Sequence, residues 1–277
     1  MRTVLHGVDQ SGPASVINTV MEKCARGHVF QDETNSRLLA FDGDRKMFVP
    51  VDGQAYWSAS APRLIVDHFG GPSIHASYSL NKGSDPQAVN FAVVSGLPSC
   101  IRGTTGDAGT GVAADAVAVA GPLSFQAGAL TRPMRFAGRL KLSAITNVML
   151  FVGFSDVLPA TTLELAIELT AGGMTTNATD AVGLVFDTTA TVKNIKSASV
   201  ANDVDGTLTD SGVAPVADTF FDFLVEVQPD GTARTYLNGT LVATHTIRTA
   251  INLCPLVVAC ARSTATRDVT IDLLGAC

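Results

Sequence analysis

The chain has 277 residues, of which 46% are hydrophobic, 16% charged and 6% aromatic. A chain of this length buries about 75% of the surface that its unfolded form exposes, which excludes a small scaffold held together by disulfides or metals. The net charge of -6 disfavours a general attraction to nucleic acid or to an anionic membrane, and we expect neither as a partner. These properties indicate a folded protein of one large or two ordinary domains.

The longest apolar run, at 148–154, is far shorter than the roughly 20 residues that a membrane span needs. The N-terminal sequence MRTVLHG turns polar at once, so we expect no secretory signal. The chain has an odd number of cysteines without a CxxC pair, which is typical of reduced thiols in a protein made in the cytoplasm. We expect them to be packing residues: Cys24, Cys100, Cys254, Cys260 and Cys277.

The first 121 residues predict little regular structure. One short helix, ending at Gly27, is predicted from apolar residues at helical spacing: Val16, Ile17, Val20, Met21 and Cys24. Between residues 28 and 70 the turn sequences at 41–45 and 51–53 predict hairpins. From Gly70 to Gly121 the chain is rich in small and polar residues and predicts a long loop, loosest at 100–112. Such a loop is usually functional or packed on a partner.

From about Met134 onward the sequence predicts strand after strand. Residues 134–142 alternate between apolar and largely basic side chains, and 148–154 predict a strand buried on both faces. Residues 221–228 and 232–237 predict two further strands, and Asn238-Gly239 predicts a tight hairpin to a third. The C-terminus predicts two more strands, at 256–262 and 268–273. We therefore expect a mainly β protein, an antiparallel β-sandwich or jelly roll over 122–277 that follows an N-terminal segment of 1–121.

Four segments of this C-terminal part carry a resemblance: VMLFVGFSD (148–156), ATDAVGLVFDT (178–188), FDFLVEVQPDGTARTYLNGTLVAT (221–244) and PLVVACARSTATRDVTIDLL (255–274). They resemble the concanavalin A-like jelly-roll domains of structural proteins of tailed bacteriophages, in particular capsid decoration and head-fibre proteins. The resemblance covers about half of the chain and consists of strand-and-turn patterns. It implies a virion protein made in the host cytoplasm, with capsid or other virion proteins as partners. It also implies a homo-oligomer, with a trimer as one candidate.

The basic side chains Arg135, Arg139 and Lys141 share one face of the strand at 134–142. They could meet an acidic partner protein or pair with acidic residues on a neighbouring strand, and we favour the second interpretation. In concanavalin A-like folds the first and last strands tend to be neighbours. The resemblance therefore implies pairing with Asp268 and Asp272.

Glycan hydrolysis is the first enzymatic activity to test, because some glucanases share this architecture. It requires two carboxylates across the scissile bond. The chain has only five glutamates, and Glu164 and Glu168, which could share one strand face, alternate with apolar residues as a solvated face would. The segment 202–206 matches part of a calcium loop but lacks its first carboxylate, so a turn is favoured. No nucleophile elbow, zinc helix or phosphate loop occurs, and the five histidines are scattered. We expect no catalytic residues, no cofactor and no metal.

The sequence thus favours a non-enzymatic virion protein, of the capsid decoration or head-fibre type, attached through residues 1–121. Its alternative is a glycan-binding adhesin such as a tail-fibre receptor-binding protein. Sugar binding usually needs an aromatic platform, and Tyr236 is the only tyrosine or tryptophan after residue 121. In the first 121 residues, Trp57 with its neighbour Tyr56 is the candidate interface anchor, because large aromatics concentrate binding energy.

Overall fold

The computed structural model describes residues 74, 76–94, 100–108, 113–159, 163–171 and 173–276, together with the backbone of five strands before residue 68. The chain forms two compact units, Met1–Leu64 and Ile65–Cys277. The expected helix ending at Gly27 lies outside the described residues. Among the residues described, no helix has the length and apolarity needed to cross a membrane.

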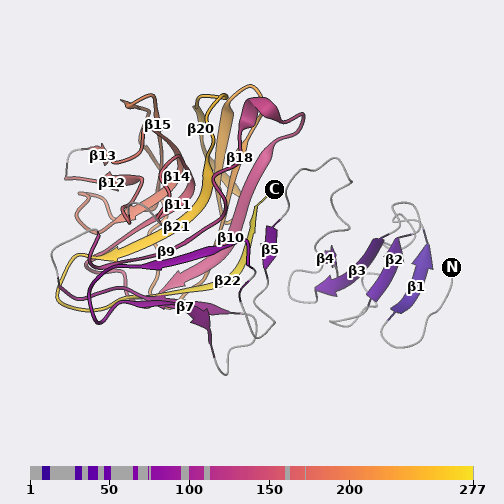
Figure 1. Cartoon of the computed structure of the whole chain (residues 1–277), viewed down its shortest axis with the longest axis horizontal. Helices are drawn as coiled ribbons and strands as arrows, with labels where there is room; N and C mark the ends of the chain where they lie inside the picture. The colour runs from indigo at the N-terminus through magenta and orange to yellow at the C-terminus, as the bar shows by residue number, and fades with distance from the viewer. Residues whose placement is uncertain are drawn as a thin grey trace. The chain divides into compact units, whose positions relative to one another are not determined.

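The first unit contains one four-stranded sheet, in the order β1-β2-β3-β4 (Figure 1). Its strands are β1 (Val8–Gly12), β2 (Val29–Asp32), β3 (Arg37–Asp42) and β4 (Met47–Pro50). Strand β1 is parallel to β2, while β3 is antiparallel to both β2 and β4. The pairing of β3 with β4 confirms the hairpin predicted around residues 41–45.

The second unit contains two sheets of eight strands each, called sheet B and sheet C. Sheet B has the order β20-β19-β18-β10-β22-β8-β7, with β5 also paired to β22. Its strands are β5 (Ile65–Asp67), β7 (Val89–Val93), β8 (Ile101–Thr104), β10 (Met134–Leu142), β18 (Phe221–Val227), β19 (Thr232–Leu237), β20 (Thr240–Thr246) and β22 (Asp268–Ala276).

Sheet C has the order β16-β15-β14-β11-β21-β9-β6, with β17 also paired to β15. Its strands are β6 (Ser79–Lys82), β9 (Ala116–Ala120), β11 (Val148–Ser155), β14 (Asp180–Asp187), β15 (Lys196–Ala201), β16 (Val204–Asp205), β17 (Thr209–Asp210) and β21 (Cys254–Ala261). A separate hairpin joins β12 (Ile167–Leu169) to β13 (Met174–Thr176), and a 3-10 helix η2 spans Ala127–Ala129. The antiparallel sandwich expected after residue 134 is confirmed.

The sandwich begins earlier than the expected boundary between residues 121 and 122. Strand β9 pairs with both β21 and β6, and β8 pairs with both β22 and β7, so strands from 79–120 lie inside both sheets. The long loop predicted over 70–121 is therefore wrong. Its strands are only four or five residues long and combine small residues such as alanine and glycine with polar and a few bulky ones, so they lack the sustained bulky alternation that marks a strand in sequence.

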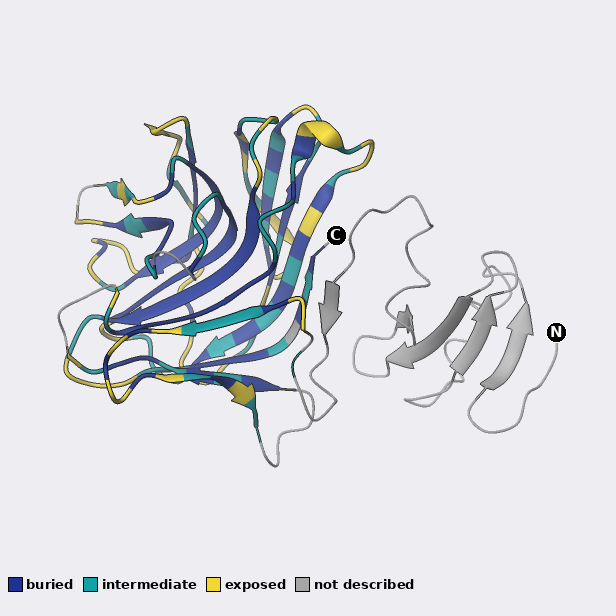
Figure 2. Ribbon diagram, in the orientation of Figure 1, coloured by how far each residue is buried: buried dark blue, intermediate teal, exposed yellow. Residues whose placement is uncertain are grey.

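Alternation of side chains builds the core between the two sheets. Phe136, Phe154 and Phe223 are buried there, and the ring of Phe136 lies 5.2 Å from that of Phe223 and 6.0 Å from that of Phe154. In Figure 2 the central strands of sheet C are dark blue along their length, because their outward side chains are buried as well. This confirms the doubly buried strand predicted at 148–154.

The β12–β13 hairpin accounts for part of that second buried layer. Leu165, Ile167 and Leu169 on or beside β12 pack with outward side chains of sheet C such as Phe151 and Val258. Each of these five residues has at most 1% of its surface exposed. Burial of this apolar surface contributes to stability in proportion to its area. The outward face of sheet C is therefore a second core layer.

The cysteines and the hairpin turn at Asn238-Gly239 have the positions that the sequence predicts. Cys100, Cys254 and Cys260 are buried, as expected for packing residues, and burial raises the pKa of Cys254 to about 12. Asn238 and Gly239 have φ values of 49° and 78°, the left-handed conformation of the predicted two-residue hairpin turn.

Candidate functional site

The outward face of sheet B carries a row of apolar side chains that crosses four strands. Tyr236 on β19 pairs with Leu241 on β20 and with Leu224 on β18. Leu224 in turn pairs with Ala137 on β10. Neighbouring strands lie about 4.8 Å apart, so the row is about 14 Å long. We call Ala137, Leu224, Tyr236 and Leu241 the Tyr236 row.

The alternation of the strands explains why this row faces outward. Phe223 and Val225 on β18 point into the core, so Leu224 between them points away from it. Leu237 points into the core in the same way, which leaves its neighbour Tyr236 outside. The first three members of the row are partly exposed, and Leu241 is 49% exposed. The row is therefore accessible apolar surface.

A charged border follows one side of the row. Glu226 accepts a hydrogen bond of 2.7 Å from Nε of Arg135, whose terminal nitrogen also lies 2.7 Å from the carboxylate, and a second bond of 2.8 Å from the side-chain amide of Gln228. Arg234 reaches the same carboxylate only at 3.5 Å and its side chain is 40% exposed. Arg135 is thus the main partner of Glu226. Arg234 keeps donors that Glu226 does not use, and these lie beside Tyr236, because the two residues are two positions apart on the same face of β19.

A second charged border follows the other side. Arg139 lies 3.9 Å from Asp222 on β18 and 3.6 Å from Asp272 on β22. Lys141 lies 3.4 Å from Asp218. These ion pairs confirm that the basic face of β10 pairs with acidic residues on neighbouring strands.

One acidic residue near this second border has a different partner from the one expected from the sequence. Asp268, expected beside β10, instead contacts Arg102 on β8 at 3.8 Å. Strand β22 is paired with β10 on one side and β8 on the other, which explains the different partner. The ring of Phe220 adds an aromatic surface, with the cationic groups of Arg139 and Lys141 at 5.1 Å and 5.3 Å from its centre.

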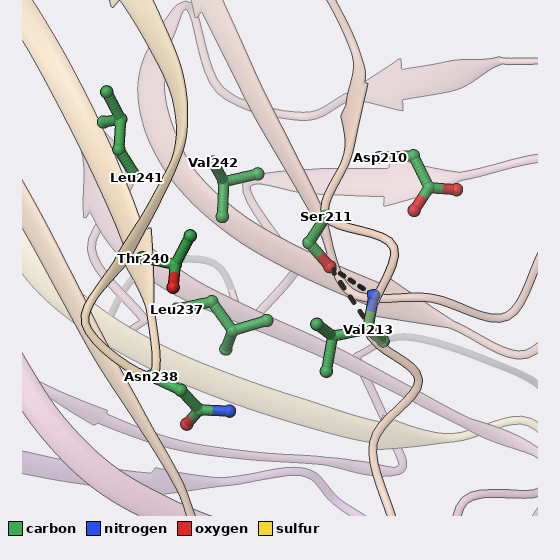
Figure 3. Close-up of a pocket in the computed structure, with 8 residues that line it drawn as sticks. All are labelled: Asp210, Ser211, Val213, Leu237, Asn238, Thr240, Leu241 and Val242. Atoms are coloured by element: carbon green, nitrogen blue, oxygen red, sulfur yellow. Dashed lines mark hydrogen bonds between the residues drawn. The ribbon is translucent and has the colours of Figure 1, made fainter.

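A pocket of about 270 Å³ lies at the Leu241 end of the row (Figure 3). In the close-up, Leu237 and Val213 point toward one another across its centre, while Asp210 lies at its edge. The hydrogen bond from the Gly212 amide, helped by one from the Asn194 side chain, holds the pKa of Asp210 below its ordinary value against the opposing effect of burial. The pocket therefore offers an apolar floor and an ionised carboxylate at its rim. Its lining residues are Asp210, Ser211, Val213, Leu237, Asn238, Thr240, Leu241 and Val242.

The carboxylates considered for hydrolysis are not arranged as a pair across an open cleft. Glu168 on β12 is only 15% exposed, and it lies 3.5 Å from Arg262 and 3.1 Å from the Asn177 amide. Burial raises the pKa of Glu168, against the lowering effect of Arg262. The expectation of an ordinary solvated face is therefore wrong for Glu168. Glu164 lies outside the regular strand, and Glu22 and Glu33 lie outside the described residues.

The segment 202–206, which matched part of a calcium loop, contains the turn that joins β15 to β16. Asn202 and Asp203 have φ values of 55° and 61°, and Val200 pairs with Asp205 across the hairpin. The turn interpretation is confirmed.

The predicted interface anchors Trp57 and Tyr56 lie outside the described residues, so their role stays a prediction. The sequence identified Tyr236 as an aromatic residue of the sandwich and missed the row around it. Leu224, Ala137 and Leu241 are far from one another in sequence, and only the strand pairing brings them together.

Several solved structures are similar to the sandwich. LamAcat from Zobellia galactanivorans has 10% sequence identity and a TM-score of 0.52, over 79% of this chain and 98% of its own. The carbohydrate recognition domain of Emp47p has 9% identity and a TM-score of 0.51, over 77% and 93%. A prokaryotic β-1,3-1,4-glucanase (lichenase) from a mouse hindgut metagenome has 9% identity and a TM-score of 0.50, over 77% and 98%.

The sandwich has a concanavalin A-like jelly-roll fold. No protein-family model matches the sequence, and no curated protein matches it. At identities near 10%, the likeness shows the fold alone. None of these three structures is described as a virion protein, so the finding supports the jelly-roll part of the sequence resemblance and leaves its virion part open.

Proposed function

We propose that the sandwich is a non-catalytic glycan-binding module and that the Tyr236 row receives the sugar. The observation that carries this proposal is the position of Tyr236 in an accessible apolar row between two charged borders. A sugar ring has an apolar C–H face and a periphery of hydroxyls. Tyrosine suits such a ligand because it combines a large apolar surface with a polar end.

The borders supply the polar groups that such a ligand needs. The carboxyl oxygens of Asp222 and Asp272 are hydrogen-bond acceptors, and Arg139 and Arg234 are donors. The pocket lies on the core side of β19, where Leu237 points, and Leu241 is the one member of the row among its lining residues. It is therefore separate from the outward surface that carries Tyr236. Several structures of the same fold carry carbohydrate-related descriptions, which is consistent with the proposal.

The proposal includes no hydrolysis. Glycosidases need one carboxyl group that can protonate the leaving oxygen and a second across the bond. Glu226 is saturated by Arg135 and Gln228, and Glu168 is held by Arg262 and Asn177. These contacts favour structural roles for both carboxylates.

Binding to a panel of immobilised glycans, followed by calorimetry with the best ligand, tests the proposal. We expect Tyr236→Ala to weaken binding at least about tenfold, as for an aromatic residue at the centre of an interface, and Tyr236→Phe to retain most of it. Val204→Ala is a matched control, because Val204 is exposed but lies on β16 of sheet C. Equal affinity of all three variants and the unaltered protein would exclude the Tyr236 row as the site.

A second candidate, suggested by the sequence resemblance, is a virion structural protein such as a capsid decoration or head-fibre protein. The division into the units Met1–Leu64 and Ile65–Cys277 is consistent with one part that attaches and one that is displayed. Trp57 and Tyr56 are candidate anchors of the attaching part, in a homo-oligomer on the particle. Electron microscopy of purified virions with an antibody against the chain tests this candidate, and absence of the label from the particles would exclude it.

A further inference from the structure

Two buried aspartates meet at one end of the sandwich, away from the Tyr236 row. Asp85 lies in the connection between β6 and β7 and is 7% exposed, and Asp115 directly precedes β9 and is 0% exposed. Both lie against Gly106, just after β8. A Cβ atom added to Gly106 would be 2.5 Å from Oδ1 of Asp115 and 2.8 Å from the carboxyl carbon of Asp85. The two carboxyl groups therefore approach each other at Gly106, where only glycine fits.

Main-chain hydrogen bonds hold both carboxyl groups in place. Oδ1 of Asp85 accepts a bond of 2.7 Å from the Gln87 amide, and Oδ1 of Asp115 accepts one of 3.0 Å from the Ala108 amide. The Asp85 amide donates to the Ala114 carbonyl at 3.1 Å, and the Gly106 amide donates to the Asp115 carbonyl at 2.9 Å. The loops are thus tied together around the two side chains.

Among the described residues, no cationic side chain balances these two aspartates. Oδ2 of Asp115 is buried and has no hydrogen-bond partner. None of the ion pairs between described residues includes Asp85 or Asp115. Burying a carboxylate is costly unless it is paired or coordinates a metal. A buried carboxylate oxygen without a protein partner is an exception that calls for a bound water, an ion or a functional role.

We propose that Asp85 and Asp115 bind one calcium ion. Carboxylate oxygens are hard ligands, and Ca²⁺ accepts them in flexible geometry with main-chain carbonyls and water. No third Asp, Glu, His or Cys joins the pair within the described residues, so carbonyls and water supply the remaining ligands. A site with so few charged ligands binds weakly, with a Kd of about 10⁻⁴ to 10⁻³ M. Because the ion would join the loops beside β6, β8 and β9, it would stabilise this end of the sandwich.

Thermal unfolding of the full chain at about pH 8, where an ordinary carboxyl group is ionised, tests the site. We expect CaCl₂ at about 5 mM to raise the Tm by about 2–9 °C relative to EDTA at matched ionic strength. Asp115→Asn and Asp85→Asn should abolish the rise. Asp203→Asn should keep it, because this exposed turn residue carries the same charge in a conformation that asparagine tolerates. In EDTA, Asp115→Asn should melt no lower than the unaltered protein, since it removes an unpaired charge.

An unchanged Tm of the unaltered protein in calcium, or the same rise in Asp115→Asn, would overturn the proposal. If both variants at the pair fail to fold, calorimetric titration of the unaltered chain decides. One Ca²⁺ per chain supports the site, and no binding excludes it.

Discussion

Nε2 of His245 lies 2.6 Å from the Ser197 hydroxyl, a contact that joins strand β20 of sheet B to strand β15 of sheet C. The other ring nitrogen lies 3.2 Å from the Ser199 hydroxyl, and Ser197 also lies 2.6 Å from the Thr235 hydroxyl. All four side chains are buried, and no acidic residue is among them. Burial lowers the pKa of His245 below its ordinary value of 6.5. The neutral imidazole is therefore the form that the fold stabilises.

We expect acidic pH to lower the stability of the sandwich through protonation of His245. The unfolded chain takes up a proton near pH 6.5 and the folded chain only at lower pH, so the unfolded state binds more protons in between. This contribution to stability is complete above about pH 6.5 and is lost as the pH falls toward the folded-state pKa. We expect the Tm to fall between about pH 7 and pH 5, and the slope to be shallower in His245→Gln. A slope that the substitution leaves unchanged would assign the acid sensitivity to other groups.

A buried and an exposed ion pair should differ sharply in their effect on stability. Arg262 donates to the fully buried carboxylate of Asp187 at 2.7 Å and 3.1 Å, so Arg262→Met leaves a buried charge without its cation. We expect a loss of about 3 kcal/mol in the free energy of unfolding. Lys141→Met removes the partner of Asp218, which is 69% exposed, and should cost less than about 1 kcal/mol. Equal losses in denaturant titrations of the two variants would contradict this.

The position of the domain boundary predicts which fragments fold. Residues 65–277 keep every strand of sheets B and C and should show a β-type circular dichroism spectrum and one cooperative melt. A fragment of 122–277 lacks β5 to β9, including the buried side chains of Ile101, Val117 and Val119. It should aggregate or melt without cooperativity. A cooperative melt of the shorter fragment would show that these strands are dispensable.

The non-catalytic proposal predicts no release of reducing ends from a polysaccharide panel. Glu168→Gln and Glu164→Gln should leave glycan binding unchanged, because neither residue belongs to the Tyr236 row. Hydrolysis by the full chain that either substitution abolishes would identify an enzyme.

Sequence patterns identified two kinds of strand: those with one apolar and one polar face, and those in which every residue is apolar. Strand β10 alternates buried and outward residues along its whole length, and its predicted bounds, 134–142, match the structure. Strand β9, Ala116–Ala120, is buried at every position but made of alanine and valine, which a small-residue loop can also contain. Its identity as a strand depends on its partners β6 and β21, which are not local in sequence.

The Tyr236 row, the proposed binding surface, was predictable only in part for the same reason. Alternation places Tyr236 on an outward face, and the basic side chains of β10 indicate acidic partners. The Tyr236 row depends on the register between strands about 90 residues apart, such as Ala137 opposite Leu224. The pairing of Asp85 with Asp115 depends in the same way on the packing of three loops around Gly106.

The second buried layer on sheet C restricts which strands of the sandwich can accept substitutions. Substitutions on strands β11, β14 and β21 disturb packing on one face or the other, because both faces are covered. The outward positions of β10, β18 and β19 are partly solvent-accessible, and changes there seldom cost much stability. Mutational drift should therefore accumulate on sheet B, where new side chains can alter what is recognised while sheet C preserves the scaffold.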